Sequence, residues 1–471
     1  MRQACKADSL EGVIENFELS GLEADSPFYV DIDVARNGEG VASVRQRIVR
    51  ELQRCSKYNQ QQPDQYQYRK LLFVGHKASG KTTELHRIHK ELEGQYETIF
   101  VGNIEQQQDR IAAQPDFLYF IVESLVRYCH AHENFSCATE EQVKRLQQYL
   151  QDRIFGQLSQ TFENGTASQM GVELGAEADT GKVPFLSVLK LFGSLSAKET
   201  LVEEQKQILN KTIRFYINDF VEIANDLLYA MQKEARKHDK MLLLILDGLD
   251  KVREQVAEEI FLSTQSFLPK LKISMIVTFP LYLNYSPDYD RAAGPFDGRP
   301  YILSVVAVHK RDGSKDSQGI QALQAIVEKR MDVDALLEQP KDLQEAILNS
   351  GGNLRDLFTF LREAAVNADI MGREQISSVD LQVAYQQKRN TLERQLVKSY
   401  MKTLNEVYYD TEKESIIPDN QSDNTLLLMF NAGLLIEYNG KRWVDLHPLV
   451  KQLVSERIQK GSWKVQEGSD V

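Results

Sequence analysis

Hydrophobic and polar residues in the first quarter of the chain alternate between helix-like and strand-like patterns. A helix is predicted at about 41–55, where apolar residues recur at intervals of four. The apolar run at 70–74 predicts a buried strand, which Gly75 ends. A helix at 81–93 and a second strand at 98–101 follow. Strand, glycine loop, helix and strand in this order form a βαβ unit, which indicates a parallel sheet.

Three later apolar runs predict further strands, at Met241–Leu246, Ile273–Phe279 and Ile302–Val308. A long amphipathic helix at about 202–236 leads into the first of them. From 316 to 386 the pattern is helical throughout. The alternation of strands and helices favours an α/β fold, followed by an all-helical region.

The stretch between the second and third predicted strands is longer than a βαβ connection requires. Residues 115–160 have a helical pattern, and 162–198 are rich in Gly and Ser around Pro184. We expect 104–240 to leave the core as a helical and Gly/Phe-rich insertion that forms a subdomain. The insertion either determines partner or effector specificity or is a passive structural insert.

The C-terminal pattern at 424–456 predicts a helix, a turn, a strand, a second turn, a second strand and a final helix. The two predicted strands, 434–438 and 442–446, flank the dipeptide Asn439-Gly440. An Asn-Gly pair between alternating strands is the strongest short signal for a hairpin. This order predicts a winged-helix domain.

These patterns divide the chain into four parts. Residues 1–60 form an N-terminal segment and helix, and 61–310 form the core with its insertion at 104–240. Residues 311–390 form a helical lid, and 391–471 form the winged-helix domain. The predicted fold is therefore an α/β, three-layer P-loop NTPase sheet with a helical insertion, followed by the lid and the winged helix.

The loop after the first predicted strand has the sequence Gly75-His76-Lys77-Ala78-Ser79-Gly80-Lys81-Thr82, which fits the Walker A pattern G-x-x-x-x-G-K-[ST]. Its glycines let backbone N–H groups turn inward around phosphates, and the following helix N-terminus adds its dipole. Lys81 is expected to reach the β and γ oxygens, and the Thr82 hydroxyl to ligate Mg²⁺. Thr83 completes the expected binding set. The sequence therefore predicts that the chain binds ATP with Mg²⁺.

The strand 242–246 ends in Asp247, as a Walker B strand does. A buried strand holds this carboxylate at its C-terminal end, beside the phosphate loop, where it can hold Mg²⁺. Asp250 follows three residues later and either polarises the attacking water as a general base or caps the next helix.

The order of these motifs resembles the ASCE division of P-loop ATPases, which includes AAA+ proteins and the signalling STAND ATPases. It is most similar to a bacterial STAND-like group of ATP-binding proteins. The segments that carry the resemblance are Phe28–Asp31, Leu72–Leu85, Pro184–Phe192, Gly351–Leu357 and Trp443–Val450. Together they span about 27–455, nearly the whole chain.

The resemblance implies roles for two more polar residues. Thr278 takes the place of sensor 1, which contacts the γ-phosphate or positions water, although the chain lacks the arginine that STAND proteins commonly have soon after this strand. The alternative for Thr278 is a strand-end hydroxyl bonded to backbone. Arg355 takes the place of a lid arginine, sensor 2, which can pair bidentately with phosphate. The alternative is an arginine paired with Asp356 or Glu363.

The predicted winged helix has two interpretations. STAND proteins use this domain as an internal clamp on the nucleotide through a histidine, for which His447 is the candidate, and the alternative is a core histidine. Winged helices also bind DNA, and Lys441 and Arg442 lie in the predicted wing. Arg291, Arg299, Arg311 and Arg330 are all candidates for an arginine finger between subunits, and the sequence does not choose among them.

The composition of the chain limits the kinds of partner that we expect. The formal net charge is −12, from 56 basic and 68 acidic residues, which argues against non-specific binding to nucleic acid or anionic lipid. The apolar runs are far too short to span a bilayer, and no secretory signal pattern follows Met1. The four cysteines lack zinc-type spacing and are expected to be free thiols. A cytoplasmic protein without a membrane partner is expected.

The sequence favours a regulatory ATPase switch that changes domain arrangement or assembly with its nucleotide, ATP or ADP. The resemblance associates such switches with signalling or phage defence, and a protein partner or self-assembly would read the state. The alternative is a DNA-acting AAA+-like ATPase, such as an initiator, loader or transposition regulator. A scaffold that binds nucleotide without hydrolysing it is a third reading.

Overall fold

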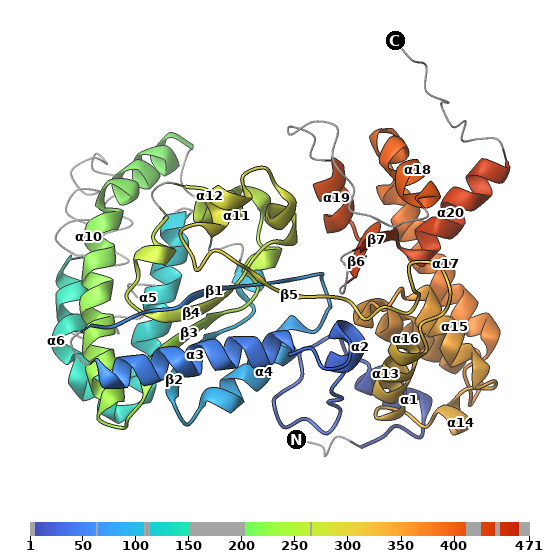
Figure 1. The fold of residues 1–471 in the computed structure, drawn as a ribbon, viewed down its shortest axis with the longest axis horizontal. Coiled ribbons are helices and arrows are strands. Elements are labelled where there is room, and N and C mark those ends of the chain that lie inside the picture. The colour runs from blue at the N-terminus through green and yellow to red at the C-terminus, as the bar shows by residue number, and fades with distance from the viewer. Residues whose placement is uncertain are drawn as a thin grey trace, which may run out of the picture.

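The computed structural model describes residues 5–62, 65–107, 111, 114–149, 203–263, 266–410, 425–438 and 443–460. Figure 1 shows a central sheet with helices around it on one side of the molecule, and the lid with the C-terminal elements on the other. In this described part of the chain, no helix combines the length and the apolar character that crossing a membrane requires. The predicted Gly/Phe-rich segment at 162–198 lies outside the described residues.

Five parallel strands form the sheet: β1 (Lys70–Gly75), β2 (Tyr96–Val101), β3 (Met241–Leu246), β4 (Ser274–Thr278) and β5 (Tyr301–Leu303). Their order is β2-β3-β4-β1-β5, so β4 lies between the phosphate-loop strand and the Walker B strand. Phe73 is paired with Thr278, and Val277 with Leu246. This register brings the carboxyl ends of β1, β3 and β4 to one edge, where ligands of open α/β sheets bind.

The sheet has helices on both faces, because alternate side chains of a strand point to opposite sides. Leu71 and Phe73 pack with helices α3 (Val44–Gln61) and α4 (Lys81–Leu92). Leu72 belongs to the cluster on the other face. The predicted three-layer α/β arrangement is confirmed.

The predicted insertion differs from the expectation that it leaves the core. Its described helices are α5 (Gln114–Ala131), α6 (Glu133–Tyr149) and α10 (Glu203–Arg236). Phe117 of α5 and Leu227 of α10 lie in the same hydrophobic cluster as Leu244 of β3. These two helices therefore form the second helical layer of the sheet, because a buried strand must be covered on both faces.

The remaining short elements connect or flank the sheet. They are α2 (Asp33–Asn37), η1 (Ile104–Gln107), η3 (Leu249–Lys251), α11 (Glu254–Phe261), η4 (Leu268–Lys270), η5 (Leu281–Tyr285) and α12 (Tyr289–Ala293). The strand predicted at 302–308 is shorter in the structure, since β5 ends at Leu303. Val305 then forms a parallel bridge with Tyr438, so the chain leaves the sheet toward the C-terminal hairpin.

The lid and the C-terminal region are helical apart from one hairpin. The lid contains α13 (Ser317–Glu328), α14 (Val333–Leu336), α15 (Lys341–Asn349), α16 (Leu354–Ile370) and α17 (Ser378–Gln395). After η6 (Lys398–Tyr400) come α18 (Met401–Tyr409), α19 (Thr425–Asn431), β6 (Leu435–Tyr438), β7 (Trp443–Leu446) and α20 (Pro448–Gln459). The antiparallel pair β6–β7 confirms the predicted hairpin.

The N-terminal segment is divided between the two halves of the molecule. Helix α1 (Leu10–Asn16) packs against α16 of the lid (Figure 1), and the ring of Phe17 meets that of Phe358 edge to face at 5.2 Å. Arg330 donates hydrogen bonds to the carbonyls of Phe28 (3.0 Å) and Ile326 (2.9 Å). Arg330 is 3% exposed, so burial removes it from the candidate arginine fingers.

Candidate phosphate-binding site

The loop 75–82 connects β1 to α4 at the carboxyl edge of the sheet. Gly80 has φ +92°, a left-handed conformation that glycine adopts without steric cost. Ala78 also has a positive φ, +66°, where a Cβ is unfavourable. The predicted loop is therefore present with a tight, inward-turned backbone, and part of its conformation is imposed on a non-glycine residue.

Lys81 is buried and lies folded against its own loop. Its Nζ donates to the carbonyl oxygens of Gly75 (2.8 Å) and His76 (2.9 Å), and lies 3.0 Å from Oδ2 of Asp250. The side chains of Lys81 and Asp250 are only 4% and 3% exposed. The structure thus places both predicted residues in one site as an ion pair.

Thr82 and Asp247, the predicted metal ligands, are in contact. The Thr82 hydroxyl donates to Oδ2 of Asp247 at 2.6 Å, whereas Oδ1 of Asp247 is buried without a hydrogen-bond partner. Burial raises the pKa of Asp247, and the hydrogen bond from Thr82 opposes that rise. An unpartnered buried carboxylate oxygen beside a hydroxyl fits a hard cation such as Mg²⁺. These two residues would hold the ion, which would supply positive charge to the phosphates.

Asp250 does not cap the next helix. Helix α11 begins at Glu254, and its N-cap residue is Arg253, which makes no side-chain capping bond. Asp250 lies instead in η3, with Oδ2 toward Lys81 and Oδ1 buried without a hydrogen-bond partner. The capping alternative is therefore wrong, and a role in the phosphate site remains the interpretation.

Thr278 is fully buried at the end of β4. Its hydroxyl accepts hydrogen bonds from the N–H groups of Gly248 (3.0 Å) and Leu249 (2.9 Å), and donates to the carbonyl of Leu246 (3.3 Å). A hydroxyl has one donor and two acceptor sites, so all three are in use. This arrangement corresponds to the backbone-bonded alternative and corrects the expected sensor: Thr278 holds the turn after β3.

Arg355 lies at the start of α16, which meets the phosphate loop. Asn353 caps this helix by accepting from the N–H groups of Arg355 and Asp356, and its amide donates to the Lys77 carbonyl at 3.4 Å. Arg355 is exposed. The pKa of Lys77 is lowered mainly by burial, opposed by Asp250, and Arg355 lowers it further, so both cations lie near the loop. Asp356 pairs with Lys388 and His447 instead of Arg355.

His76 connects the phosphate loop to the C-terminal hairpin. Its Nε2 accepts a hydrogen bond from the backbone N–H of Glu437 in β6 at 2.9 Å, and its ring lies 5.8 Å from that of Phe430. Burial, reinforced by the charge of Lys81, lowers the pKa of His76 to about 3, so the ring is neutral. The Walker A pattern identifies position 76 only as a variable loop residue and carries no signal for this contact.

The N-terminal segment also contributes residues that the sequence did not reveal. Arg36 of α2 is 6% exposed and donates from Nη2 to the carbonyl of Ser79 in the loop. Its Nη1 lies 3.7 Å from Oε1 of Glu84. The N–H of Leu22 donates to the hydroxyl of Thr83 at 3.0 Å. No local sequence pattern predicts that Arg36 is buried against the loop, because its partner Ser79 lies 43 residues away.

His447 is a core histidine, as one of the two interpretations predicts. It is 1% exposed, its Nδ1 accepts from the N–H of Leu449 (3.2 Å), and its Nε2 donates to Asp356 (3.1 Å). These bonds join the start of α20 to the start of α16. The histidine therefore connects the lid to the C-terminal region.

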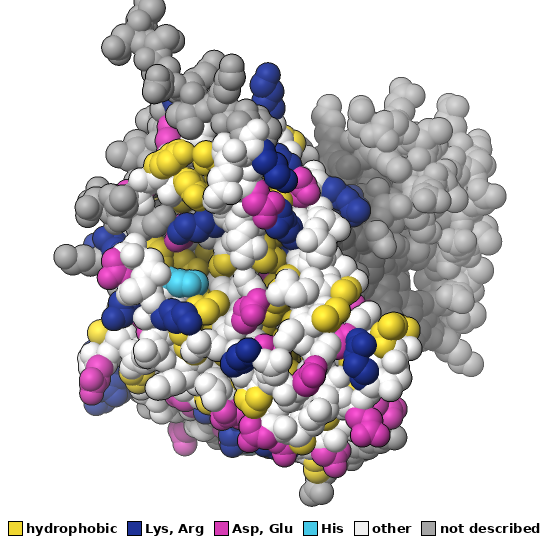
Figure 2. Space-filling model, turned by 90° about the vertical axis from the view of Figure 1, so that its right-hand side faces the viewer, with side chains coloured by type: hydrophobic (Ala, Val, Ile, Leu, Met, Phe, Trp, Pro, Cys, Tyr) yellow, Lys and Arg dark blue, Asp and Glu magenta, His cyan; other side chains and the backbone are white. Residues whose placement is uncertain are grey.

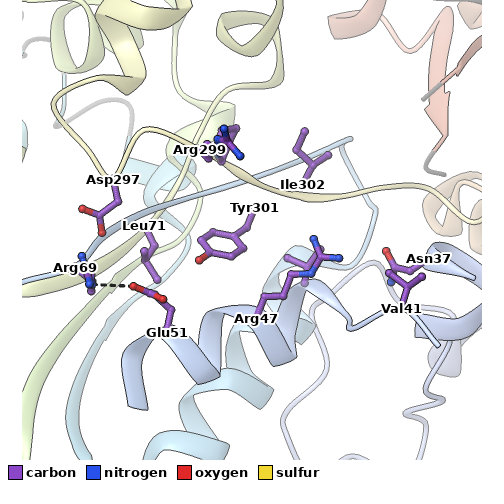
Figure 3. Close-up of a pocket in the computed structure, with 12 residues that line it drawn as sticks. Asn37, Val41, Arg47, Glu51, Arg69, Leu71, Asp297, Arg299, Tyr301 and Ile302 are labelled. Atoms are coloured by element: carbon purple, nitrogen blue, oxygen red, sulfur yellow. Dashed lines mark ion pairs between the residues drawn. The ribbon is translucent and has the colours of Figure 1, made fainter. Parts of the chain in front are cut away.

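A separate cavity of about 880 Å³ lies between α3 and the edge strand β5 (Figure 3). Tyr301 points into it, and Arg69 and Glu51 form an ion pair at its far end, with Nε and Oε1 2.9 Å apart. Of the candidate finger arginines, Arg299 lines this cavity. None of the loop residues from His76 to Thr82 lines it, so the cavity is distinct from the phosphate site.

No protein-family model and no curated protein matches the chain. Among solved structures, it is similar to the Aeropyrum pernix ORC2 protein in ADPNP-ADP complexes, with 13% identity over 90% of this chain and 96% of that chain, and a TM-score of 0.35. The Aeropyrum pernix ORC1 protein in complex with DNA has 10% identity, coverages of 90% and 94%, and a TM-score of 0.35. Cdc6p from Pyrobaculum aerophilum has 12% identity, coverages of 92% and 99%, and a TM-score of 0.32.

These TM-scores describe a loose likeness, so the class of the protein follows from its own sheet and loop. The loop 75–82, whose sequence fits the Walker A pattern, joins β1 to α4, and a carboxylate at the end of β3 is hydrogen-bonded to the loop threonine. Both lie at the carboxyl edge of a five-stranded parallel sheet. The chain therefore has the fold of a P-loop NTPase. Its resemblance to the STAND-like group stays a prediction.

Proposed function

We propose that the chain binds ATP at the loop 75–82, hydrolyses it slowly, and uses the nucleotide state to set the arrangement of its lid and C-terminal hairpin. The observation that carries this proposal is the hydrogen bond between His76 of the phosphate loop and the backbone of β6. The Asn353–Lys77 bond adds a second direct contact, from the lid. A ligand that repositions the loop must act on both contacts.

The residues of the site divide the work in this proposal. The backbone of residues 76–81 and Lys81 bind the phosphates, Thr82 and Asp247 hold Mg²⁺, and Arg355 reaches the phosphates from the lid. Asp250 orients the attacking water from its place beside Lys81. Slow hydrolysis is expected because the hydroxyl of Thr278, in the sensor 1 position, is already occupied by backbone.

Hydrogen bonds and ion pairs connect the lid to the C-terminal region, so a movement of one should be transmitted to the other. Oη of Tyr438 donates to the carbonyl of Gly351 at 2.8 Å, and Asp356 pairs with both Lys388 of α17 and His447. Entry of a phosphate beside Lys81 competes with the Lys81–Asp250 pair and thereby changes the loop. A ligand shifts such an equilibrium only by its different affinities for the two states, which ATP and ADP supply through the γ-phosphate.

Hydrogen exchange of the full chain with saturating ATP·Mg²⁺, with ADP·Mg²⁺ and without nucleotide tests the switch. The amides of β6 and of the first turn of α16 should exchange at different rates in the ATP and ADP states. Lys81→Ala, which removes the phosphate-binding ammonium, should give one exchange pattern in all three conditions. Identical exchange in the wild-type ATP and ADP states would overturn the switch. Size-exclusion in the same conditions reports whether assembly follows.

Two cations of the C-terminal helix α20 add no support to the DNA-acting alternative. Arg457 pairs with Glu393 at 2.5 Å, and Lys451 pairs with Asp445 at 3.3 Å, so both cations already have partners within the chain. Figure 2 shows the face that carries the lid and C-terminal elements, where basic side chains are interspersed with acidic ones. Lys441 and Arg442 lie outside the described residues.

ATP turnover with and without duplex DNA at ~150 mM salt separates the two functions. For a switch that does not act on DNA, turnover should be the same in both conditions. Strong stimulation by DNA that is lost when Lys441 and Arg442 are both replaced by Ala would establish the alternative.

A further inference from the structure

Position 248, directly after the Walker B carboxylate, has no room for a side chain. Gly248 has φ +103°, which side-chain-bearing residues rarely adopt. A Cβ built on it would lie 2.1 Å from Oε2 of Glu105 and 2.9 Å from the backbone nitrogen of Ile104. The carboxylate of Glu105 therefore occupies the space that a side chain at 248 would fill.

Glu105 belongs to η1, which follows the carboxyl end of β2. The N–H of Ile104 donates to the carbonyl of Asp247 at 3.2 Å, which ties η1 to the turn after β3. Oε1 of Glu105 receives a hydrogen bond from Nζ of Lys251 at 2.7 Å. Oε2 is buried without a hydrogen-bond partner, so one oxygen is held while the other is available.

The two other carboxylates near this turn, those of Asp247 and Asp250, contact residues of the phosphate loop. Asp247 bonds Thr82 through Oδ2, and Asp250 pairs with Lys81 at 3.0 Å. Asp247 and Asp250 are therefore bound to the two loop residues that are proposed to hold Mg²⁺ and phosphate. Glu105 instead pairs through Oε1 with Lys251, which lies outside the phosphate loop, and its side chain is 22% exposed, which gives a proton a route to solvent.

We propose that Glu105 is the general base of the hydrolysis, and this inference rests on the proposed ATPase function. The water oxygen forms a bond to the γ-phosphorus while one water proton moves to Oε2 of Glu105. The bond between the γ-phosphorus and the β–γ bridging oxygen breaks, and its electron pair stays with ADP. Glu105 then releases the proton to solvent. Asp250 orients the water, and Lys251 positions Glu105.

Glu105→Gln tests this assignment in the full chain, because it keeps the shape of the side chain and removes its basicity. The kcat should fall by about 100-fold or more, the usual contribution of a general base. The affinity for a fluorescent ATP analogue and the unfolding temperature should stay at wild-type values. The acid limb of the kcat–pH profile should disappear. Glu140→Gln, which breaks an exposed pair with Lys144 on α6, is the matched control and should leave all four quantities unchanged.

Lys251→Met adds a readout that a structural role would not move. Without the ammonium, Oε1 of Glu105 loses its hydrogen bond, so kcat should fall while the affinity for the ATP analogue stays at the wild-type value. If the turnover of Glu105→Gln stays within threefold of the wild-type value, the inference is overturned. Loss of turnover only together with loss of nucleotide binding or folding would also overturn it. No turnover by the wild type would instead count against hydrolysis in the proposed function.

Discussion

Three carboxylate side chains surround the turn that follows β3, and each has one buried oxygen without a hydrogen-bond partner. They belong to Asp247, Asp250 and Glu105. At the scale of residues, these oxygens destabilise the fold, because a buried acceptor without a donor is unfavourable. A ligand that binds the oxygens would remove this cost. Gly248 at the centre of the turn makes the close approach of Glu105 sterically possible.

Replacement of Gly248 by Ala tests this crowding directly. Gly248→Ala should destabilise the protein by more than about 1–3 kcal/mol, the usual cost of a strained backbone conformation, because the new Cβ also displaces Glu105. Turnover should fall with it. Urea unfolding and ATPase assays measure the two effects.

Gly298→Ala is the matched control, since Gly298 has φ +78° and open space around its Cβ position. It should show the backbone cost alone and wild-type turnover. Equal destabilisation by the two substitutions would contradict the crowding of Gly248 by Glu105.

At the scale of elements, α1 functions as part of the lid although it precedes the sheet in the chain. Phe17, which follows the last residue of α1, is fully buried, and the rings of Phe17 and Phe358 meet edge to face. A parallel bridge between Ala7 and Met331 adds a backbone connection to the lid. The segment between α1 and α3 therefore spans the phosphate site, with Leu22 against Thr83 on the way.

Phe17→Ala should release α1 from the lid. Truncation of a buried Phe destabilises a packed core by about 3–5 kcal/mol, and part of this loss should appear as faster hydrogen exchange of 10–16. Leu19→Ala, two residues later at a side chain that is 46% exposed, is the control and should change little. Unchanged exchange in Phe17→Ala would mean that other contacts hold the helix.

At the scale of the whole molecule, the phosphate loop, the lid and the C-terminal hairpin meet around His76. The ring is neutral and buried, and it accepts the N–H of Glu437. A protonated ring has no acceptor nitrogen, so protonation breaks the contact between core and hairpin. The arrangement of the two halves should therefore depend on pH, and in the proposed switch also on the nucleotide.

Stability should fall on acidification through His76. Burial lowers its pKa to about 3, against about 6.5 in an unfolded chain, so between these values only the unfolded chain binds the proton. The stabilising contribution is complete above the unfolded pKa and decreases as pH falls. From pH 7 to 5 the loss should be about 2 kcal/mol.

His76→Gln provides the comparison, because its amide oxygen can accept the same N–H without titrating. Urea unfolding of both proteins at pH 5, 6 and 7 measures the difference. If the wild type and His76→Gln lose the same free energy of unfolding between pH 7 and 5, His76 does not titrate in this way.

Much of the sheet and of the site was predictable because it rests on local patterns. The strands and helix around residues 70–101, the Walker A loop and Asp247 follow from apolar runs and a contiguous motif. The sequence leaves two roles open for Asp250, and only the structure places it beside Lys81. Glu105 had a weaker signal, as an acidic residue just after the carboxyl end of a predicted parallel strand. Arg36 had none.

By itself, the sequence determined the α/β pattern, the phosphate loop and the C-terminal hairpin, since each depends on residues close together in the chain. Only the tertiary structure decided that α5 and α10 cover the sheet, that α1 joins the lid, and that His76 meets β6. These outcomes depend on pairs such as His76 and Glu437, 361 residues apart. Burial and hydrogen bonding select such pairs in three dimensions, and no local spacing records the choice.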